Sequence, residues 1–367
     1  MIISQTPYRI SFFGGGTDYP VWYEQYGGSV ISTTIDKYCY LTCRYLPPFF
    51  EHKSRVVWSI VERVKENFDI RHPSVRATLE YMGITDGVEI HHDGDLPART
   101  GIGTSSAFTV GLLHSLYALK SIMPTKEQLA KEAIHVEREI LKENVGAQDQ
   151  VAVAYGGLNR ITFGRDHSFH VQPIILPGTR LIELQSHCML FFTGFSRSAS
   201  EVARKQIENT HKKKSALSRM QQMVDEALEL LLSNTEITEF GKLLHESWFL
   251  KRSLAEGVST GEVDTLYEEA CEAGAVGGKL LGAGGGGFML LFVRPSDQDK
   301  VRERLRNLLL VPFRFENSGS QIVFYRPARR KSDQPIIPKS PTIRGEAAGE
   351  VIQKYTFPYH EAREQSG

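Results

Sequence analysis

The feature of this sequence that most constrains its fold is the distribution of its glycines. The chain has 32 glycines in 367 residues, and many gather in three clusters, at residues 14–16, 101–103 and 277–287. Glycine has no Cβ atom, so its backbone reaches conformations and close approaches that other residues cannot. The clusters therefore predict places where the backbone turns sharply or lies close to a ligand.

Charge and hydropathy exclude several classes of protein. Lysine plus arginine and aspartate plus glutamate both number 43, so no basic excess indicates a nucleic-acid binder. The 41% of hydrophobic residues is typical of a globular protein. No apolar run approaches the roughly 20 residues that cross a membrane, and the N-terminus lacks the pattern of a signal peptide. We therefore expect a cytoplasmic protein with no nucleic-acid or membrane partner.

Cysteines and histidines do not predict a metal site. The four cysteines are too few and too scattered for a disulfide framework or a zinc site, so we expect reduced thiols. His91, His92 and Asp93 are neighbours on a predicted strand. Adjacent side chains of a strand point to opposite faces, so we interpret these three residues as structural.

Hydrophobic periodicity predicts mainly strands in the first half of the chain and mainly helices in the second. We expect strands over 2–13, 29–35, 38–45, 88–92, 288–293, 313–315 and 321–325, and helices over 105–119, 125–142, 196–233, 236–256, 260–273 and 296–309. This order is typical of an α+β fold with two lobes. We assign residues 1–180 to the first domain and 181–326 to the second, and expect residues 327–367 to form a flexible tail.

The middle glycine cluster, Pro97–Ala107, predicts an anion site. Gly101 and Gly103 let the backbone approach a ligand, and the helix that follows offers free N–H groups at the positive end of its dipole. The hydroxyls that open this helix suit phosphate oxygens or a metal. The alternative is a plain strand–turn–helix connection with a serine cap. A Walker A loop is excluded, because no Gly-Lys-Ser/Thr follows at the required spacing.

The other two clusters are less specific. At the N-terminus, a strand delivers Arg9 and then Thr17 and Asp18 at a glycine-rich turn, which Asp18 could simply cap. Residues 282–287 match Gly-x-Gly-x-x-Gly, but we expect them to follow a helical segment and to enter a strand. A dinucleotide-binding loop follows a strand and opens a helix, so we predict instead a flexible backbone surface packed close to another group.

Two carboxylates form a fourth feature. Glu137 lies inside a predicted helix, and Asp149 follows just beyond its end in the sequence Gly-Ala-Gln-Asp-Gln. Carboxylates on either side of a helix end could approach one metal or one reacting hydroxyl. The alternative is an ordinary surface pair without a function.

Taken in order, these features resemble the GHMP kinase superfamily, which includes galactokinases, homoserine kinases and mevalonate kinases. Its motif Pro-x-x-x-Gly-Leu-Gly-Ser-Ser-Ala resembles Pro97–Ala107, with Ile102 and Thr104 as variants. Its N-terminal Pro-x-Arg strand resembles Pro7–Arg9, and its last glycine-rich motif resembles Lys279–Phe288. The resemblance implies a two-lobed fold, with an N-terminal domain like ribosomal protein S5 and a ferredoxin-like C-terminal lobe.

Within that superfamily, residues 11–18, 94–101 and 194–201 are most similar to the D-glycero-D-manno-heptose 7-phosphate kinases, which phosphorylate O1 of an already phosphorylated sugar. Galactokinases have Gly-Glu-His-Thr-Asp-Tyr where this chain has Gly14–Tyr19, and the missing Glu and His disfavour galactose. A kinase for an unphosphorylated sugar such as L-fucose and a non-catalytic sugar sensor remain open alternatives.

The resemblance also implies ligands and the residues that bind them. The phosphates of ATP would lie against Arg99, Gly101, Gly103, Thr104, Ser105 and Ser106. Ser106 and Glu137 would hold Mg²⁺, the second cofactor. Asp149 would lie against the sugar hydroxyl, either taking its proton or only orienting it. Arg9, beside Asp149, would offset charge on the transferring phosphoryl group.

The sugar phosphate would be the small-molecule partner besides ATP. The residues that would bind it are Thr17, Asp18, Arg197, Gly284 and Gly285. Among these Arg197 is the first candidate for the existing phosphate, followed by Lys251 and Arg252, because a phosphate needs a cation. For the oligomeric state, a monomer and a homodimer both remain open.

Overall fold

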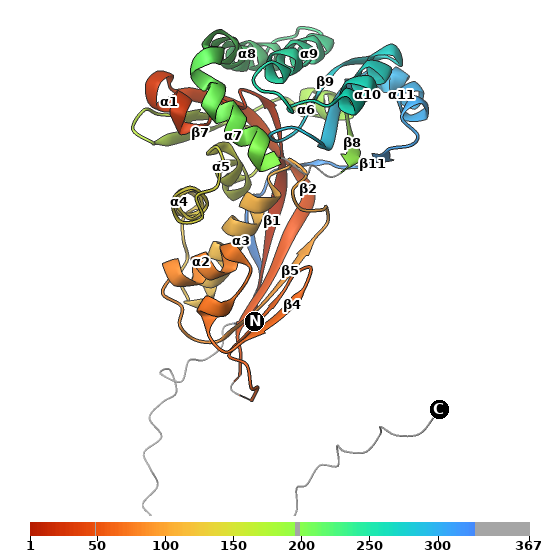
Figure 1. Ribbon diagram of the computed structural model, residues 1–367. Coiled ribbons are helices and arrows are strands. Elements are labelled where there is room, and N and C mark those ends of the chain that lie inside the picture. Colours follow the sequence, from red (N-terminus) through yellow and green to blue (C-terminus); the bar gives the residue numbers. More distant parts are fainter. Residues whose placement is uncertain (48, 195–198, 327–367) are drawn as a thin grey trace, which may run out of the picture. The chain divides into compact units, whose positions relative to one another are not determined.

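The computed structural model describes residues 1–47, 49–194 and 199–326 of the chain (Figure 1). Arg197 and the predicted tail over residues 327–367 lie outside the described residues. The described part combines helices with one nine-stranded and one four-stranded sheet, which confirms the predicted mixture of helix and sheet.

The nine-stranded sheet has the order β13-β1-β2-β5-β3-β4, while β12 and β6 also pair with β2 and β7 pairs with β6. Only β3 and β5 run parallel among these pairs. Its strands are β1 (Ile2–Phe13), β2 (Gly28–Tyr45), β3 (Ser54–Val57), β4 (Val61–Val64), β5 (Val88–Gly94), β6 (Asn159–Phe163), β7 (Phe169–Pro173), β12 (Phe315–Glu316) and β13 (Gln321–Tyr325). The end of the described chain therefore returns to the sheet in which it began.

Strand β2 replaces the two strands that we expected over 29–35 and 38–45. It is continuous over 18 residues and pairs with β1 along its length. The register with β1 shifts between Pro7 and Tyr8, which face Tyr38 and Ile35. Asp36 and Lys37, which lie between Ile35 and Tyr38 in β2, therefore form an irregularity of the pairing and do not end the strand.

The smaller sheet is antiparallel and has the order β11-β8-β10-β9. It consists of β8 (Cys188–Gly194), β9 (Ala275–Leu280), β10 (Gly287–Val293) and β11 (Leu309–Leu310). Strand β9 was not predicted. We expected a helical segment before Gly282–Gly287, and this expectation is wrong, because the run joins β9 to β10. Gly277 in β9 is required for packing, since a Cβ atom there would lie 2.0 Å from the carbonyl oxygen of Gly241.

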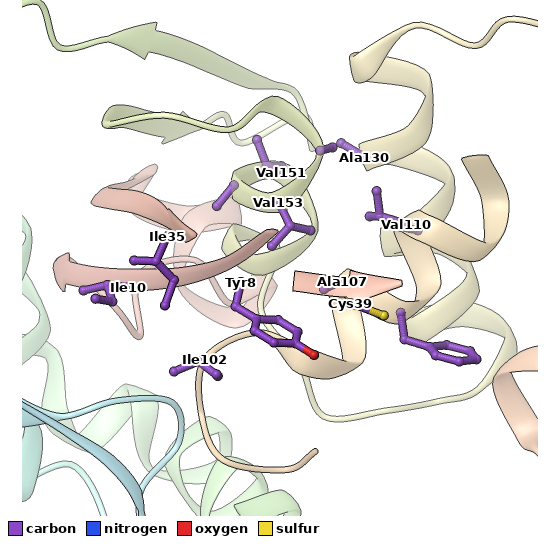
Figure 2. Close-up of a cluster of buried hydrophobic side chains, with 14 of the residues drawn as sticks. Tyr8, Ile10, Ile35, Cys39, Ile102, Ala107, Val110, Ala130, Val151 and Val153 are labelled. Carbon is purple, nitrogen blue, oxygen red and sulfur yellow. The ribbon is translucent and has the colours of Figure 1, made fainter. Parts of the chain in front are cut away.

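Helices α2 (Pro73–Tyr81), α3 (Thr104–Leu119), α4 (Lys126–His135) and α5 (Gln148–Tyr155) lie on one side of the long strands (Figure 1). Helix α3 is buried on almost every side. Thr125 caps α4 and accepts a hydrogen bond from the backbone of Gln128 at 3.0 Å. The helix continues as a π-helical turn, η2 (Val136–Ile140). Figure 2 shows side chains of α3, α4 and α5 in one hydrophobic cluster with Tyr8, Ile10 and Ile35 of the sheet.

The remaining α-helices are α1 (Pro20–Tyr26), α6 (Gly178–Ser186), α7 (Ala199–Asn209), α8 (Lys214–Leu232), α9 (Thr238–Arg252), α10 (Gly261–Glu272) and α11 (Gln298–Arg304). Two predicted helices are shorter than expected. A 3₁₀ turn over Thr210–Lys213 divides the predicted segment 196–233, and α11 occupies only part of 296–309. No helix in the described part of the chain is both long and apolar enough to cross a membrane.

The cysteines form no disulfide, and the two neighbouring histidines of β5 contact different groups. All four cysteines are free. His91 faces Glu89, whereas His92 packs edge-on against Phe108, so the two rings have different neighbours. Within the described residues, no group of three or more His, Cys, Asp or Glu side chains could hold a metal ion.

Phe240 of α9 joins the two sheets. Its ring packs edge-on against Phe12 and Phe13 of β1, with centroids 5.5 and 5.0 Å away, and lies 5.8 Å from Phe292 of β10. Phe240 is fully buried. One side chain therefore contributes to the hydrophobic contacts of both sheets.

We predict that Phe240→Ala lowers the free energy of unfolding by about 3–5 kcal/mol, because it leaves a cavity between the sheets. Urea denaturation measures this change. Phe68→Ala is the control, since Phe68 is 72% exposed and its removal is expected to change the free energy by less than about 0.5 kcal/mol. Equal effects of the two substitutions would contradict the prediction.

Candidate active site

The centre of the site is an ion pair between Arg9 and Asp149. Arg9 Nε donates to Asp149 Oδ1 at 2.7 Å, and Arg9 Nη2 donates to Oδ2 at 2.6 Å. Arg9 comes from the middle of β1, while Asp149 lies in the first turn of α5, a helix that was not predicted. The bidentate geometry fixes the carboxylate in one orientation.

Arg9 also holds the loop that precedes α3. Its Nη1 donates to the carbonyl oxygen of Gly101 at 2.7 Å, and its backbone N–H donates to that of Ile102 at 3.0 Å. Figure 2 shows Ile102 beside Tyr8 and Ile10 of β1. Three segments that are distant in sequence therefore meet at one guanidinium group.

The loop before α3 has the geometry of an anion site. Gly101 and Gly103 have φ values of +82° and +75°, and Arg99 adopts a φ of +62°, which is uncommon for a residue with a side chain. No side chain caps α3 at Gly103, so the N–H groups of its first turn can bind an anion. The hydroxyl of Thr104, which accepts a hydrogen bond from the backbone of Arg99 at 3.1 Å, steadies the loop.

Glu137 and Ser106 lie together, as the resemblance implied. Ser106 Oγ donates to Glu137 Oε2 at 3.0 Å, and Gln150 Nε2 donates to the same oxygen at 2.5 Å. Glu137 is fully buried in the π-helical turn η2, and its Oε1 has no hydrogen-bond partner. Burial, with a smaller contribution from Glu143, raises the pKa of Glu137 to about 7.

These two residues fit a hard cation. Mg²⁺ prefers oxygen ligands, and an unpartnered, buried carboxylate oxygen beside a serine hydroxyl offers them. A buried polar atom without a partner normally costs free energy, so its presence calls for a functional explanation. π-helical turns are also frequent at functional sites.

Asp18 lies in the turn after β1, the strand that carries Arg9. It is 2% exposed, and its Oδ1 accepts a hydrogen bond from the backbone of Gly16 at 2.9 Å. Burial, together with the nearby charge of Asp149, raises the pKa of Asp18. The hydroxyl of Thr17 donates to the carbonyl oxygen of Gly14 at 2.8 Å, which fixes the turn that carries Asp18.

The C-terminal glycine run packs on the loop before α3. A Cβ atom at Gly101 would lie 2.5 Å from the carbonyl oxygen of Leu281, and one at Gly287 would lie 2.3 Å from that of Thr100. The backbone N–H of Phe288 donates a hydrogen bond to the carbonyl oxygen of Thr100 at 3.2 Å. The glycines at these positions are therefore needed because two backbones touch.

Gly284 and Gly285 face a different segment. A Cβ atom at Gly284 would lie 2.5 Å from the carbonyl oxygen of Val258, and the backbone N–H of Gly285 donates to that oxygen at 3.1 Å. The structure thus brings the two predicted substrate-binding glycines close to the connection between α9 and α10.

Sequence reasoning missed several polar residues around the ion pair. Ser11 Oγ donates to Gln148 Oε1 at 2.8 Å, one residue before Asp149. Lys279, to which the sequence assigned no role, is buried nearby, and so is Lys251, a predicted candidate for binding the sugar's phosphate, although lysine is among the residues least often found inside a protein. Arg252, a candidate for binding the sugar's phosphate, forms an ion pair with Asp264 at 2.9 Å.

We predict that Glu137→Gln changes how stability depends on pH in metal-free protein. The pKa of Glu137 is raised, so the folded protein retains a proton that the unfolded chain loses above about pH 4.5. The contribution of this group to the free energy of unfolding therefore falls as the pH rises from about 4.5 to about 7, by up to about 3 kcal/mol. The amide variant should lack this loss and be more stable than the wild type at pH 8.

Urea denaturation at pH 5 and pH 8 with a chelator tests this prediction. If the free energy of unfolding changed equally with pH in the wild type and the variant, Glu137 would not cause the predicted loss of stability.

Comparisons with known proteins agree with the fold and the motifs. Residues 57–157 match the family of GHMP kinases N terminal domains, and residues 227–309 match GHMP kinases C terminal. The D-glycero-alpha-D-manno-heptose 7-phosphate kinase of Campylobacter jejuni is 28% identical over 334 residues, which cover 83% of this chain and 93% of that protein. The bifunctional fucokinase/GDP-fucose pyrophosphorylase of Arabidopsis thaliana is 26% identical over 82% of this chain and 31% of its own length.

A solved structure supports the fold. The D-glycero-D-manno-heptose 1-phosphate kinase of Bacteroides thetaiotaomicron superposes with a TM-score of 0.72 at 23% identity, covering 87% of this chain and 98% of that one. The order of the motifs, the two family matches and this fold lead to one conclusion: the chain belongs to the GHMP kinases.

Proposed function

We propose that the chain is an ATP-dependent sugar kinase that transfers the γ-phosphate to the anomeric O1 of D-glycero-D-manno-heptose 7-phosphate, giving heptose 1,7-bisphosphate. The observation that carries phosphoryl transfer is the Arg9–Asp149 pair, which touches the anion-binding loop at Gly101. The choice of sugar is supported by the similarity to the Campylobacter jejuni heptose 7-phosphate kinase along most of both chains.

The loop before α3 would bind the phosphates of ATP. Its free N–H groups and the positive end of the helix dipole favour negative charge there. Ser106 and Glu137 would hold Mg²⁺, and the metal, when bound, would neutralise charge on the phosphates.

Asp149 would orient the sugar hydroxyl and accept its proton. Because both carboxylate oxygens are held by Arg9, the side chain is already positioned before the sugar binds. Arg9 would also offset negative charge on the transferring group. Asp18 would bind further hydroxyls of the sugar from the neighbouring turn.

The glycines before Asp18 support a large sugar. A Cβ atom at Gly15 would meet only Gln148 Nε2, at 3.5 Å, and Ser11 Oγ, at 3.8 Å. The side chains that galactokinases carry at Gly15 and Gly16 are missing here, which we interpret as favouring a sugar larger than galactose. At Gly16 a Cβ atom would lie 3.1 Å from Leu217, so the added room lies at Gly15.

A kinase for a free sugar such as L-fucose is the second candidate, and the similarity to the plant fucokinase supports it. A non-catalytic sugar sensor is less well supported. Arg9, Asp149, Ser106 and Glu137 are held in two hydrogen-bonded pairs, which a sensor would not need.

³¹P NMR of the protein with MgATP and D-glycero-D-manno-heptose 7-phosphate tests the proposal. A new anomeric phosphate resonance that grows together with ADP would support both the activity and the position of transfer. A parallel sample with L-fucose distinguishes the second candidate. A product from fucose alone would overturn the heptose assignment and leave the kinase assignment intact.

We predict that Asp149→Asn lowers kcat by about 10²–10⁴, the usual contribution of a general base. Asp225→Asn is a matched control, because Asp225 also pairs with an arginine, Arg160 at 2.6 Å, but is 61% exposed. A coupled assay of ADP release measures both variants. A kcat for Asp149→Asn within a few-fold of the wild type would show that the carboxylate does not take the proton.

A further inference from the structure

Two lysines are buried beside the Arg9–Asp149 pair, and the mechanism described so far uses neither. Lys251 lies in the last turn of α9 and is 6% exposed, while Lys279 lies in β9 and is 2% exposed. Neither forms an ion pair with a carboxylate within the described part of the chain. A buried charge without such a partner is costly, so these positions call for an explanation.

Both ammonium groups bind backbone carbonyls next to the site. Lys251 Nζ donates to Leu280 at 2.7 Å and to Gly282 at 2.6 Å. This backbone is the segment that touches the anion-binding loop, since a Cβ atom at Gly282 would lie 2.3 Å from the Cα atom of Gly101. Lys251 therefore holds the backbone segment that packs against the loop before α3.

Lys279 binds the strand that carries Arg9. Its Nζ donates to the carbonyl oxygen of Phe12 at 2.9 Å, three residues after Arg9 on β1. The bond connects β9 of the smaller sheet to β1 of the larger one. Lys279 thus ties the strand of Arg9 to the smaller sheet.

The charges around the lysines are mixed. Lys251 is near Lys279 and Arg9, which oppose its charge, and near Asp149 and Asp18, which favour it. Lys279 is near Arg9 and Asp18. Burial, reinforced by these cations, lowers the pKa of Lys279 to about 7 and that of Lys251 well below its ordinary range.

The hydrogen bonds of the two lysines agree with their lowered pKa values. A neutral amine has two N–H groups, and the carbonyls of Leu280 and Gly282 accept both from Lys251. An ammonium group has three donors. A protonated Lys251 therefore has one N–H group beyond the two that bind Leu280 and Gly282. A protonated Lys279 has two beyond the one that binds Phe12. An anion that enters the site can accept hydrogen bonds from these additional N–H groups.

We propose that Lys251 and Lys279 are positioning residues for phosphoryl transfer, which hold the Gly282 backbone and strand β1 around the Arg9–Asp149 pair, and that Lys279 takes up a proton when anionic phosphates enter. This inference rests on the proposed roles of Arg9 and Asp149. It does not depend on which sugar is the acceptor.

Proton uptake by the wild-type protein is the first test. Calorimetric titration with MgATP at pH 8, without sugar, is repeated in buffers of different ionisation enthalpy. We expect a net uptake approaching one proton per chain, because incoming phosphate raises the pKa of a neighbouring lysine. Zero uptake would overturn the proposal, whether or not any variant folds.

Variants provide the second test. Lys279→Met should abolish most of the uptake, and Lys251→Met and Lys279→Met should each lower kcat on the order of 10²-fold, since small displacements of catalytic groups have effects of this size. Lys279→Arg, which remains charged, should restore part of kcat and flatten the decline of kcat/KM above about pH 7. Wild-type kcat values in the folded methionine variants would overturn the proposal.

Lys120→Met is the matched control, because Lys120 also donates to a backbone carbonyl, that of Met82 at 3.0 Å, away from the site. It should leave both kcat and proton uptake unchanged. The two proposals can fail separately. Uptake with MgATP but no turnover of the heptose phosphate would reject the substrate, whereas turnover without uptake would reject the role of the lysines.

Discussion

The site depends on one buried guanidinium group. Arg9 bonds both oxygens of Asp149 and the carbonyl oxygen of Gly101, so a strand, a loop and a helix are fixed relative to one another by a single side chain. Arg9 is 3% exposed and Asp149 is 26% exposed at the side chain. Removing one member of such a pair leaves an uncompensated charge in a poorly solvated place, typically at a cost of about 3–5 kcal/mol. The interaction therefore stabilises the fold at the place where we propose that phosphoryl transfer occurs.

Close backbone contact is the second requirement. The loop before α3 and the connection between β9 and β10 touch at Gly101, Gly282 and Gly287, where any Cβ atom would overlap the opposite backbone. The loop is thereby covered by a segment about 180 residues later in the chain. This contact explains why glycines cluster at two distant places, and it brings Lys251 to the site through the carbonyl of Gly282.

The charged groups of the site are held in unfavourable surroundings. Burial raises the pKa of Glu137 and Asp18 and lowers that of Lys251 and Lys279. Such groups reduce the stability of the empty protein, and ligands of opposite charge relieve the cost. The phosphates and the divalent cation that we propose as ligands would supply opposite charges to these groups.

The sequence by itself determined the mixed fold class, helices α3 and α4, most helices of the second half, and the order of the glycine motifs with Arg9, Ser106, Glu137 and Asp149. Local periodicity and glycine spacing carry that information. The sequence left α1, α2, α5, α6 and the strands β3, β4, β6 and β7 of the first half unpredicted. Only the tertiary structure decided that 28–45 is a single strand, that β9 precedes the last glycine run, and that Lys251 and Lys279 are buried at the site. These features arise from contacts between residues far apart in the chain, so no local pattern predicts them.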